Sequence, residues 1–327
     1  MSNQLAVITI ICLTAGAVGR AQQAPTPPPS PGVEKADEGA VFRTDTRLVV
    51  LPVTVVDKSG HLITNLPQTA FQVFENGIRQ DIKLFRREDV PVSMGLIVDN
   101  SGSMRDKREK VKDASLTLVK ESNPEDEVFV VNFNDDAYLD TKDFTNDLKE
   151  LEEALSKIDA RGGTAMRDAI RMSIDHLKEK AKRDKRVLVV VTDGNDNASM
   201  INLENLVKAA QQSEVLIYSI GLLSQEEGRE AKRAERALKA LAQATGGDSY
   251  FPKELEDVER VAHQVAKDVR NQYTIAYSPT NQALDGTFRQ IKVVANGPNR
   301  PTVRTRSGYY ATTEAALTVS RNAGGTK

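Results

Sequence analysis

The chain has 327 residues, which at roughly 100–200 residues per domain is enough for two folded domains. Hydrophobic residues make up 39% of it and charged residues 28%, a balance typical of a globular protein. Lysine and arginine (44) nearly match aspartate and glutamate (46), so the net charge of -2 provides no basic field for nucleic acid. One cysteine and three histidines exclude most zinc sites, and no apolar stretch reaches the roughly 18 residues of a membrane-spanning helix.

The first segment has the pattern of an export signal. Residues 5–18 are apolar, and Gly19 and Ala21 place small side chains at positions -3 and -1 of a cut after Ala21. This pattern predicts a cleaved signal peptide over residues 1–21, and therefore a secreted or periplasmic protein. The alternative is a buried strand or helix at the start of the chain.

Two further segments lack the pattern of a folded core. Residues 22–40 include a run in which five of the 13 prolines fall between positions 24 and 32, which predicts a stiff extended linker. Residues 313–327 lose all hydrophobic periodicity and are expected to form a flexible tail.

Residues 91–278 alternate short apolar runs with amphipathic helical patterns. Buried parallel strands are expected at 94–98, 127–133, 186–191, 215–220 and 272–277. Apolar residues at helical spacing predict helices over 148–158, 166–181, 231–241 and 255–269. Strands that alternate with helices indicate an α/β fold with a doubly wound, mostly parallel sheet flanked by helices.

The flanks of this body, residues 41–90 and 279–312, are rich in strand-forming residues instead. Asn76-Gly77 between two such runs is a strong hairpin signal. Neither flank alone can bury a sheet face, but together they approach the size of an immunoglobulin-type sandwich. We therefore expect one small β-sandwich formed by both chain ends, with the α/β body inserted in it. The alternative is two separate β-extensions.

Oxygen-bearing side chains gather where the expected parallel strands end. Asp99, Ser101 and Ser103 follow the first strand and precede a helix expected from Met104, in the loop position at which open α/β sheets bind ligands. Such a set suits a hard divalent cation, and its single negative charge leaves the ion able to accept an anionic ligand. Two further loops offer Thr164, after two glycines, and Asp193, after the strand 186–191.

The order DxSxS, GGT and TDG is the pattern of the metal-ion-dependent adhesion site, and residues 91–277 resemble the von Willebrand factor type A domain. With the flanking phrases FQVFENG and RSGYY, the resemblance extends over residues 41–312 to VWFA-related proteins of the bacterial secreted, acidobacterial type. It implies Mg²⁺ or Mn²⁺, with Ca²⁺ less favoured, at Asp99, Ser101, Ser103, Thr164 and Asp193.

The resemblance also implies a role for each of these residues. Ser101 and Ser103 would coordinate the ion directly, and Thr164 directly or through water. Asp99 and Asp193 would act largely through water. Because the site loop follows the end of a strand, we expect it at the surface, where substitution of Asp99 would spare the fold.

Three neighbouring features have plainer interpretations. Residues 193–204 mimic an EF-hand loop, but position 6 is Ala198 instead of glycine and a strand precedes it, so residues 195–197 are interpreted as a solvated turn. Asp168 either orients the Thr164 loop or complements the helix dipole. The basic runs 107–112 and 178–186 are interpreted as solvated helix faces.

The sequence shows no nucleophile–base pair, P-loop or Rossmann fingerprint, and we expect no enzyme activity. The leading hypothesis is a secreted, metal-dependent binding module, used in adhesion or complex assembly, that coordinates an Asp or Glu of a partner protein. Two alternatives stay open. One is a metal-assisted hydrolase with Asp193 or Asp196 as general base. The other is a structural subunit of an envelope complex, in which the metal only braces the loops.

Overall fold

The computed structural model describes residues 47–157, 159–223, 228–297 and 300–312, all within a compact unit that covers residues 45–327. The expected signal peptide and tail, and the proline-rich linker, lie outside the described residues. No helix in the described ranges is long and apolar enough to cross a membrane.

A six-stranded sheet forms the centre of the α/β body, in the order β10-β9-β8-β5-β6-β7. All neighbouring strands are parallel except the edge strand β7, which runs antiparallel to β6. In chain order the strands are β5 (Val92–Asp99), β6 (Glu127–Phe133), β7 (Ala137–Leu139), β8 (Lys185–Thr192), β9 (Leu216–Gly221) and β10 (Ser249–Tyr250). The expected mostly parallel sheet is therefore confirmed.

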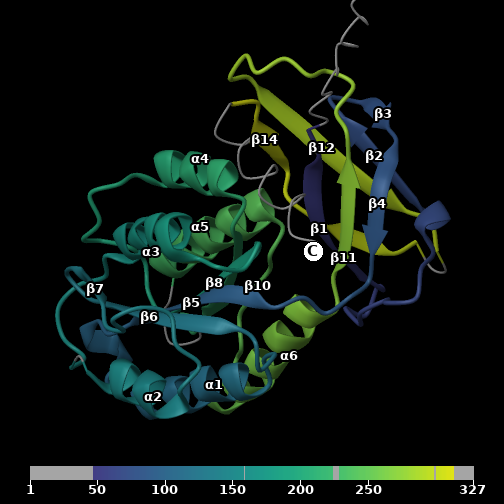
Figure 1. Cartoon of the computed structure of the whole chain (residues 1–327). Coiled ribbons are helices and arrows are strands. Elements are labelled where there is room, and N and C mark those ends of the chain that lie inside the picture. Colours follow the sequence, from purple (N-terminus) through teal and green to yellow (C-terminus); the bar gives the residue numbers. More distant parts are fainter. Residues whose placement is uncertain (1–46, 158, 224–227, 298–299, 313–327) are drawn as a thin grey trace, which may run out of the picture. The chain divides into compact units, whose positions relative to one another are not determined.

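Helices cover both faces of this sheet (Figure 1). One apolar core joins the sheet to α1, α2 and α6, and a second joins its other face to α3, α4 and α5. The helices are α1 (Arg108–Lys120), α2 (Leu148–Ser156), α3 (Met166–Lys180), α4 (Leu203–Ser213), α5 (Arg229–Thr245) and α6 (Val258–Arg270).

Local chemistry explains where several of these elements begin and how closely they pack. Asp147 caps α2 and Asn202 caps α4, because each side-chain oxygen accepts a hydrogen bond from a backbone N–H in the first turn. Gly95 lets β5 pack tightly, since a Cβ there would lie 2.5 Å from Phe129 Cζ and 2.6 Å from Leu188 Cδ2. The central strand is thus held between its neighbours by shape as well as by hydrogen bonds.

Two four-stranded antiparallel sheets, built from both ends of the described chain, form the expected β-sandwich. Their orders are β13-β1-β11-β4 and β14-β12-β2-β3, and one apolar core lies between them. The strands are β1 (Val49–Val56), β2 (Phe71–Glu75), β3 (Ile78–Gln80), β4 (Ile82–Arg86), β11 (Tyr273–Tyr277), β12 (Phe288–Ala295), β13 (Thr302–Arg304) and β14 (Gly308–Tyr310). Strand β1 pairs with β13 and β2 pairs with β12, so the two flanks share their sheets.

The structure confirms the hairpin and corrects two other expectations. Asn76 and Gly77 both have positive φ, 47° and 80°, as the tight turn between β2 and β3 requires. Residues 272–277 do not belong to the parallel sheet, since β11 pairs antiparallel with β1 and β4. A short apolar run looks alike in a parallel sheet and in a sandwich core. The helix expected from Met104 begins at Arg108, after a 3-10 turn over Gly102–Met104.

One buried carboxylate ties the two sheets of the sandwich together. Glu75 on β2 accepts hydrogen bonds from the hydroxyls of Tyr277 (2.7 Å) on β11 and Tyr309 (2.9 Å) on β14. Because Glu75 and Tyr277 come from opposite flanks of the α/β body, this contact also joins distant parts of the chain.

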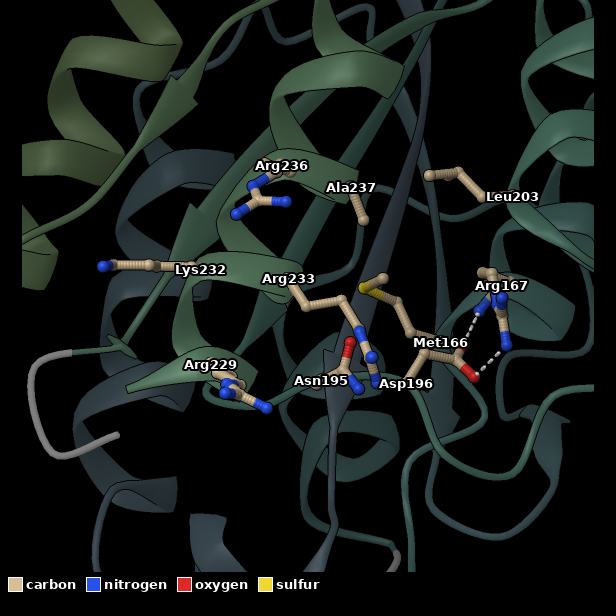
Figure 2. Close-up of a pocket in the computed structure, with 10 residues that line it drawn as sticks. All are labelled: Met166, Arg167, Asn195, Asp196, Leu203, Arg229, Lys232, Arg233, Arg236 and Ala237. Atoms are coloured by element: carbon tan, nitrogen blue, oxygen red, sulfur yellow. Dashed lines mark hydrogen bonds and ion pairs between the residues drawn. The ribbon is translucent and has the colours of Figure 1, made fainter. Parts of the chain in front are cut away.

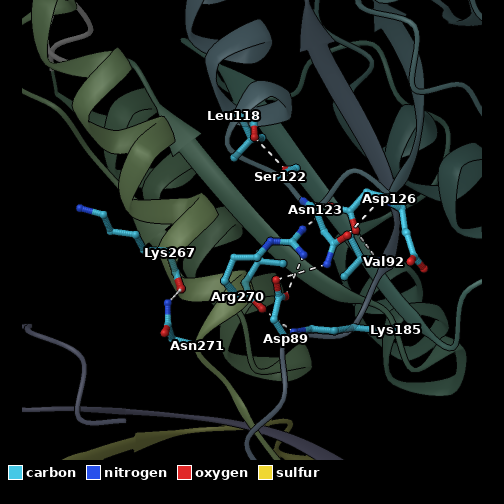
Figure 3. A network of polar contacts seen from close by, with 12 residues as sticks. Asp89, Val92, Leu118, Ser122, Asn123, Asp126, Lys185, Lys267, Arg270 and Asn271 are labelled. Atoms are coloured by element: carbon cyan, nitrogen blue, oxygen red, sulfur yellow. Dashed lines mark hydrogen bonds and ion pairs between the residues drawn. The ribbon is translucent and has the colours of Figure 1, made fainter.

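A polar network holds the carboxyl end of α6 against β8 and the segment before β5 (Figure 3). Arg270 forms ion pairs with Asp89 and Asp126, and the Lys185 ammonium donates a 2.5 Å hydrogen bond to the Val269 carbonyl. Lys185 is half-buried as a residue, but its ammonium lies away from solvent beside Arg270. Desolvation, aided by the charge of Arg270, lowers the pKa of Lys185 to about 7.

This lowered pKa predicts a pH dependence of stability. Between about pH 7 and the ordinary lysine pKa near 10, the unfolded chain binds a proton at Lys185 that the folded chain does not, so stability rises with pH. Lys185→Met should remove roughly 1–2 kcal/mol of the rise in unfolding free energy between about pH 7.5 and 9.5. Urea unfolding at both pH values measures it, with the exposed Lys182→Met as control. An identical rise in Lys185→Met and wild type would contradict it.

Candidate metal centre

Three loops meet at the edge of the parallel sheet where β5 and β8 end. The backbone N–H of Gly102 donates to the Gly162 carbonyl (3.2 Å), and the N–H of Arg161 donates to the Asn100 carbonyl (2.9 Å). These two hydrogen bonds join the loop after β5 to the loop that carries Thr164. The parallel register of β5 and β8 brings Asp193 to the same edge.

Asp99 is fully buried at the end of β5, so the expectation of a surface position is wrong. Its Oδ1 accepts a hydrogen bond from the Ser101 N–H (2.7 Å), and its Oδ2 accepts one from the Thr192 hydroxyl (2.6 Å). Burial raises the pKa of Asp99 to about 6, although these hydrogen bonds oppose that shift. The carboxylate therefore shapes its own loop and attaches it to β8.

The two serines and Asp193 form a continuous chain of oxygen atoms. The Ser101 and Ser103 Oγ atoms lie 3.2 Å apart, and the Ser103 hydroxyl donates a 2.8 Å hydrogen bond to Asp193 Oδ1. The structure thus brings four of the five expected ligand residues, Asp99 among them, into one hydrogen-bonded group. Asp193 is fully buried and Ser103 is exposed, so the group opens to solvent at Ser103.

Thr164 reaches the same edge by a separate route. Its N–H donates to Asn197 Oδ1 (2.9 Å), and its carbonyl accepts from the N–H groups of Asn197 and Ala198. Within the described residues no hydrogen bond joins its hydroxyl to the other four expected ligands. Contacts of its backbone, and not of the Thr164 hydroxyl, therefore hold this loop near Ser101.

Asp135, a residue that sequence reasoning missed, lies against the two glycines before Thr164. Gly162 has a φ of +74°, and a Cβ there would lie 2.0 Å from Asp135 Oδ2. Asp135 Oδ1 accepts a 2.6 Å hydrogen bond from the Gly163 N–H. No sequence spacing marks Asp135, because the loop after β6 that carries it has no motif of its own.

Lys107 is the second residue that sequence reasoning missed. Lys107 belongs to the basic run 107–112, for which we expect a solvated helix face. It is instead buried, and its ammonium lies 2.5 Å from Asp193 Oδ2. The Lys107–Asp193 pair supplies a positive charge inside the site. The 3-10 turn between Ser101 and α1 brings Lys107 back toward the sheet edge, which a helix starting at Met104 would not have predicted.

The loop after Asp193 is held against α3 by hydrogen bonds and an ion pair, so it is not a solvated turn. Asp196 accepts a hydrogen bond from the Arg167 N–H (2.7 Å) and pairs with the Arg167 guanidinium (2.9 Å). Asp168 accepts hydrogen bonds from the N–H groups of Met200 and Ile201, so it fixes this loop and does not orient Thr164. The loop follows strand β8 and not a helix, and its sixth residue, counted from Asp193, is Ala198 instead of glycine, so it is not an EF-hand.

The donor set fits a hard divalent cation in its chemistry. Every candidate ligand atom is an oxygen, and hydroxyls outnumber carboxylates. Within the described residues no three His, Cys, Asp or Glu side chains form a metal-binding group, so a cation here would depend on Ser101, Ser103 and Thr164. Such an ion would also share Asp193 with the Lys107 ammonium.

Comparison with known proteins supports the fold of this region. Residues 94–195 match the family model of the von Willebrand factor type A domain. No curated protein matches the chain.

Solved structures similar to this chain include three bacterial proteins. An aerotolerance-related membrane protein from Bacteroides fragilis is 19% identical over 54% of this chain and 98% of its own, with a TM-score of 0.41. A von Willebrand factor type A protein from Catenulispora acidiphila is 14% identical over 84% and 77%, with a TM-score of 0.48. The vWF domain of the type V pili tip protein Mfa5 from Porphyromonas gingivalis is 12% identical over 56% and 97%, with a TM-score of 0.45.

The burial of Asp99 predicts a cost in stability when its carboxylate is removed. Asp99→Ala leaves the Ser101 N–H and the Thr192 hydroxyl without an acceptor, which should lower the unfolding free energy by about 1–3 kcal/mol. Asp99→Asn keeps an acceptor oxygen and should cost less. Urea unfolding of both variants measures this difference, and an Asp99→Ala variant as stable as wild type would contradict it.

Proposed function

We propose that the α/β body, of which residues 94–195 match the von Willebrand factor type A domain model, is a metal-dependent module that binds another protein. The supporting observation is the hydrogen-bonded group of Asp99, Ser101, Ser103 and Asp193 at the edge of the sheet. Together with Thr164, these residues would hold Mg²⁺ or Mn²⁺.

The charge of the site favours an acidic ligand. Neutral hydroxyls supply most of the donors, and the Asp193 charge is already offset by Lys107 at 2.5 Å. A bound divalent ion would keep much of its positive charge and supply an electrophilic position for an outside carboxylate. An Asp or Glu of a partner protein provides that group with a charge-assisted bond.

The contacts of the two candidate bases argue against the hydrolase alternative. Asp193 uses one oxygen to accept from Ser103 and the other to pair with Lys107. Asp196 accepts from the Arg167 backbone and side chain and from the Ser199 hydroxyl. Both carboxylates thus already have structural partners, so binding without catalysis is the simpler proposal.

We further propose that the module acts outside the cytoplasm, in adhesion or in assembly of an envelope complex. The support is the export pattern over residues 1–21, which lies outside the described part of the chain. The assignment to the bacterial secreted, acidobacterial type likewise stays a prediction from the flank phrases.

Metal binding and capture together test the proposal. Calorimetric titration with Mn²⁺ should show one site in the wild type and an affinity at least about tenfold weaker in Ser103→Ala, because that variant removes a donor and the contact to Asp193. The exposed Ser59→Ala is the matched control. Immobilised protein should then capture an envelope protein with Mg²⁺ and lose it with chelator or in Ser103→Ala.

Two results would contradict the proposal in different ways. Equal Mn²⁺ affinity in wild type and Ser103→Ala would refute the metal site. A captured partner that stays bound after chelation would favour the bracing alternative, in which the metal only supports the loops.

Because Lys107 contacts Asp193, we predict that the site binds metal more tightly when Lys107 is replaced by an uncharged residue. Lys107→Met removes a positive charge that contacts Asp193 and repels a second cation, so Mn²⁺ affinity should rise several-fold. The exposed Lys110→Met, in the first turn of α1, is the control. Titration of both variants checks the prediction, and a weaker affinity in Lys107→Met would show that the ammonium supports the site and does not compete with it.

A further inference from the structure

A cavity of about 720 Å³ lies beside the candidate metal centre, between the start of α3, the loop after β8 and the outer face of α5. Figure 2 shows Arg233 reaching from α5 toward Asn195 and Asp196, with Met166 and Leu203 on the opposite side. We call this cavity the α5 pocket. Nothing in the proposed metal chemistry uses it.

The α5 pocket is strongly basic, although the chain as a whole carries a net charge of -2. Five basic side chains line it, against a single carboxylate, that of Asp196. Asp196 is already paired with Arg167, the one basic residue contributed by α3. The other four are on successive turns of α5, where like charges repel. They are Arg229, Lys232, Arg233 and Arg236.

Most of these α5 charges have no carboxylate partner among the residues that the structure describes. Within the described ranges Arg229, Lys232 and Arg236 have no ion-pair partner, and Arg233 has only Glu230 at 3.5 Å. Arg229, Lys232, Arg233 and Arg236 are all exposed. A concave surface lined by unpaired cations concentrates the local positive potential and attracts anions.

The remaining lining of the α5 pocket indicates which kind of anion fits. Leu203 and Ala237 are partly exposed and add an apolar surface among the cations, whereas Met166 is fully buried. A polyphosphate or sulfated sugar presents anionic groups without apolar ones, whereas a peptide segment presents both. Asn195 and Asp196 also follow Asp193 by two and three residues, so the wall of the pocket continues from the metal loop.

We propose that the α5 pocket binds an acidic peptide segment, next to the carboxylate that the metal centre would hold. This inference rests on the proposed function for the identity of the partner, but the pocket needs no metal of its own. The segment would place acidic side chains against Arg229, Arg233 and Arg236, and apolar ones against Leu203 and Ala237.

The test uses the full chain and a fluorescein-labelled six-residue peptide of alternating glutamate and leucine in the presence of chelator. Arg229→Glu combined with Arg236→Glu should weaken binding at least about tenfold, because two cations of the pocket become anions. Neither change breaks an ion pair among the described residues. The matched control is Lys110→Glu with Lys149→Glu, two exposed residues in the first turns of α1 and α2, which should change affinity less than about twofold. Wild-type binding should weaken with added salt.

Several outcomes would overturn the proposal. These are equal affinity of the pocket variant and wild type, equal binding of the same peptide with glutamine in place of glutamate, and tighter binding of a heparin-derived oligosaccharide than of the acidic peptide. Mn²⁺ titration of wild type and of the pocket variant separates the proposal of a metal site from the proposal of a peptide-binding pocket. If wild type binds no Mn²⁺ but the peptide results hold, the metal proposal fails and the α5 pocket stands. If Mn²⁺ binds but the peptide results fail, only the α5 pocket is refuted.

Discussion

The arrangement of the candidate site depends on one buried carboxylate at the end of the central strand. Strand β5 has parallel neighbours on both sides, and all eight of its residues are buried. Its last residue, Asp99, uses one oxygen to fix the Ser101 backbone and the other to hold Thr192 of β8. A buried acceptor with two donors costs less free energy than one left unsatisfied, so the fold itself maintains these contacts. The loop is therefore positioned before any ligand arrives.

Parallel strand geometry explains why residues far apart in sequence converge here. Because parallel strands end at the same edge, Ser103 after β5 and Asp193 after β8 come within 2.8 Å although 90 residues separate them. The antiparallel sandwich joins the ends of the body in a different way. Glu75 before the body and Tyr277 after it share a hydrogen bond, so insertion of the α/β body leaves the sandwich closed.

The sequence was sufficient for the elements that short motifs define. The DxSxS, GGT and TDG loops, the Asn76-Gly77 turn and the mostly parallel sheet were all predicted from local patterns. What it could not provide were contacts set by tertiary structure. Lys107 looked like a surface charge because helical periodicity does not reveal a 3-10 turn before α1. Asp135 carries no motif, and β11 was assigned to the wrong sheet because its apolar run fits either environment.

The local charges around the sheet edge differ from the charge of the whole chain. Lys107 offsets Asp193 inside the site, and the α5 pocket adds exposed cations beside it. Both features work in the same direction, since each makes this edge more favourable for an acidic surface than the net charge of -2 suggests. Clustered charge of one sign steers oppositely charged partners during encounter, and its effect falls with ionic strength. Specificity for an acidic partner would then arise from the shape of the edge, with a carboxylate at the serine loop and neighbouring acids along α5.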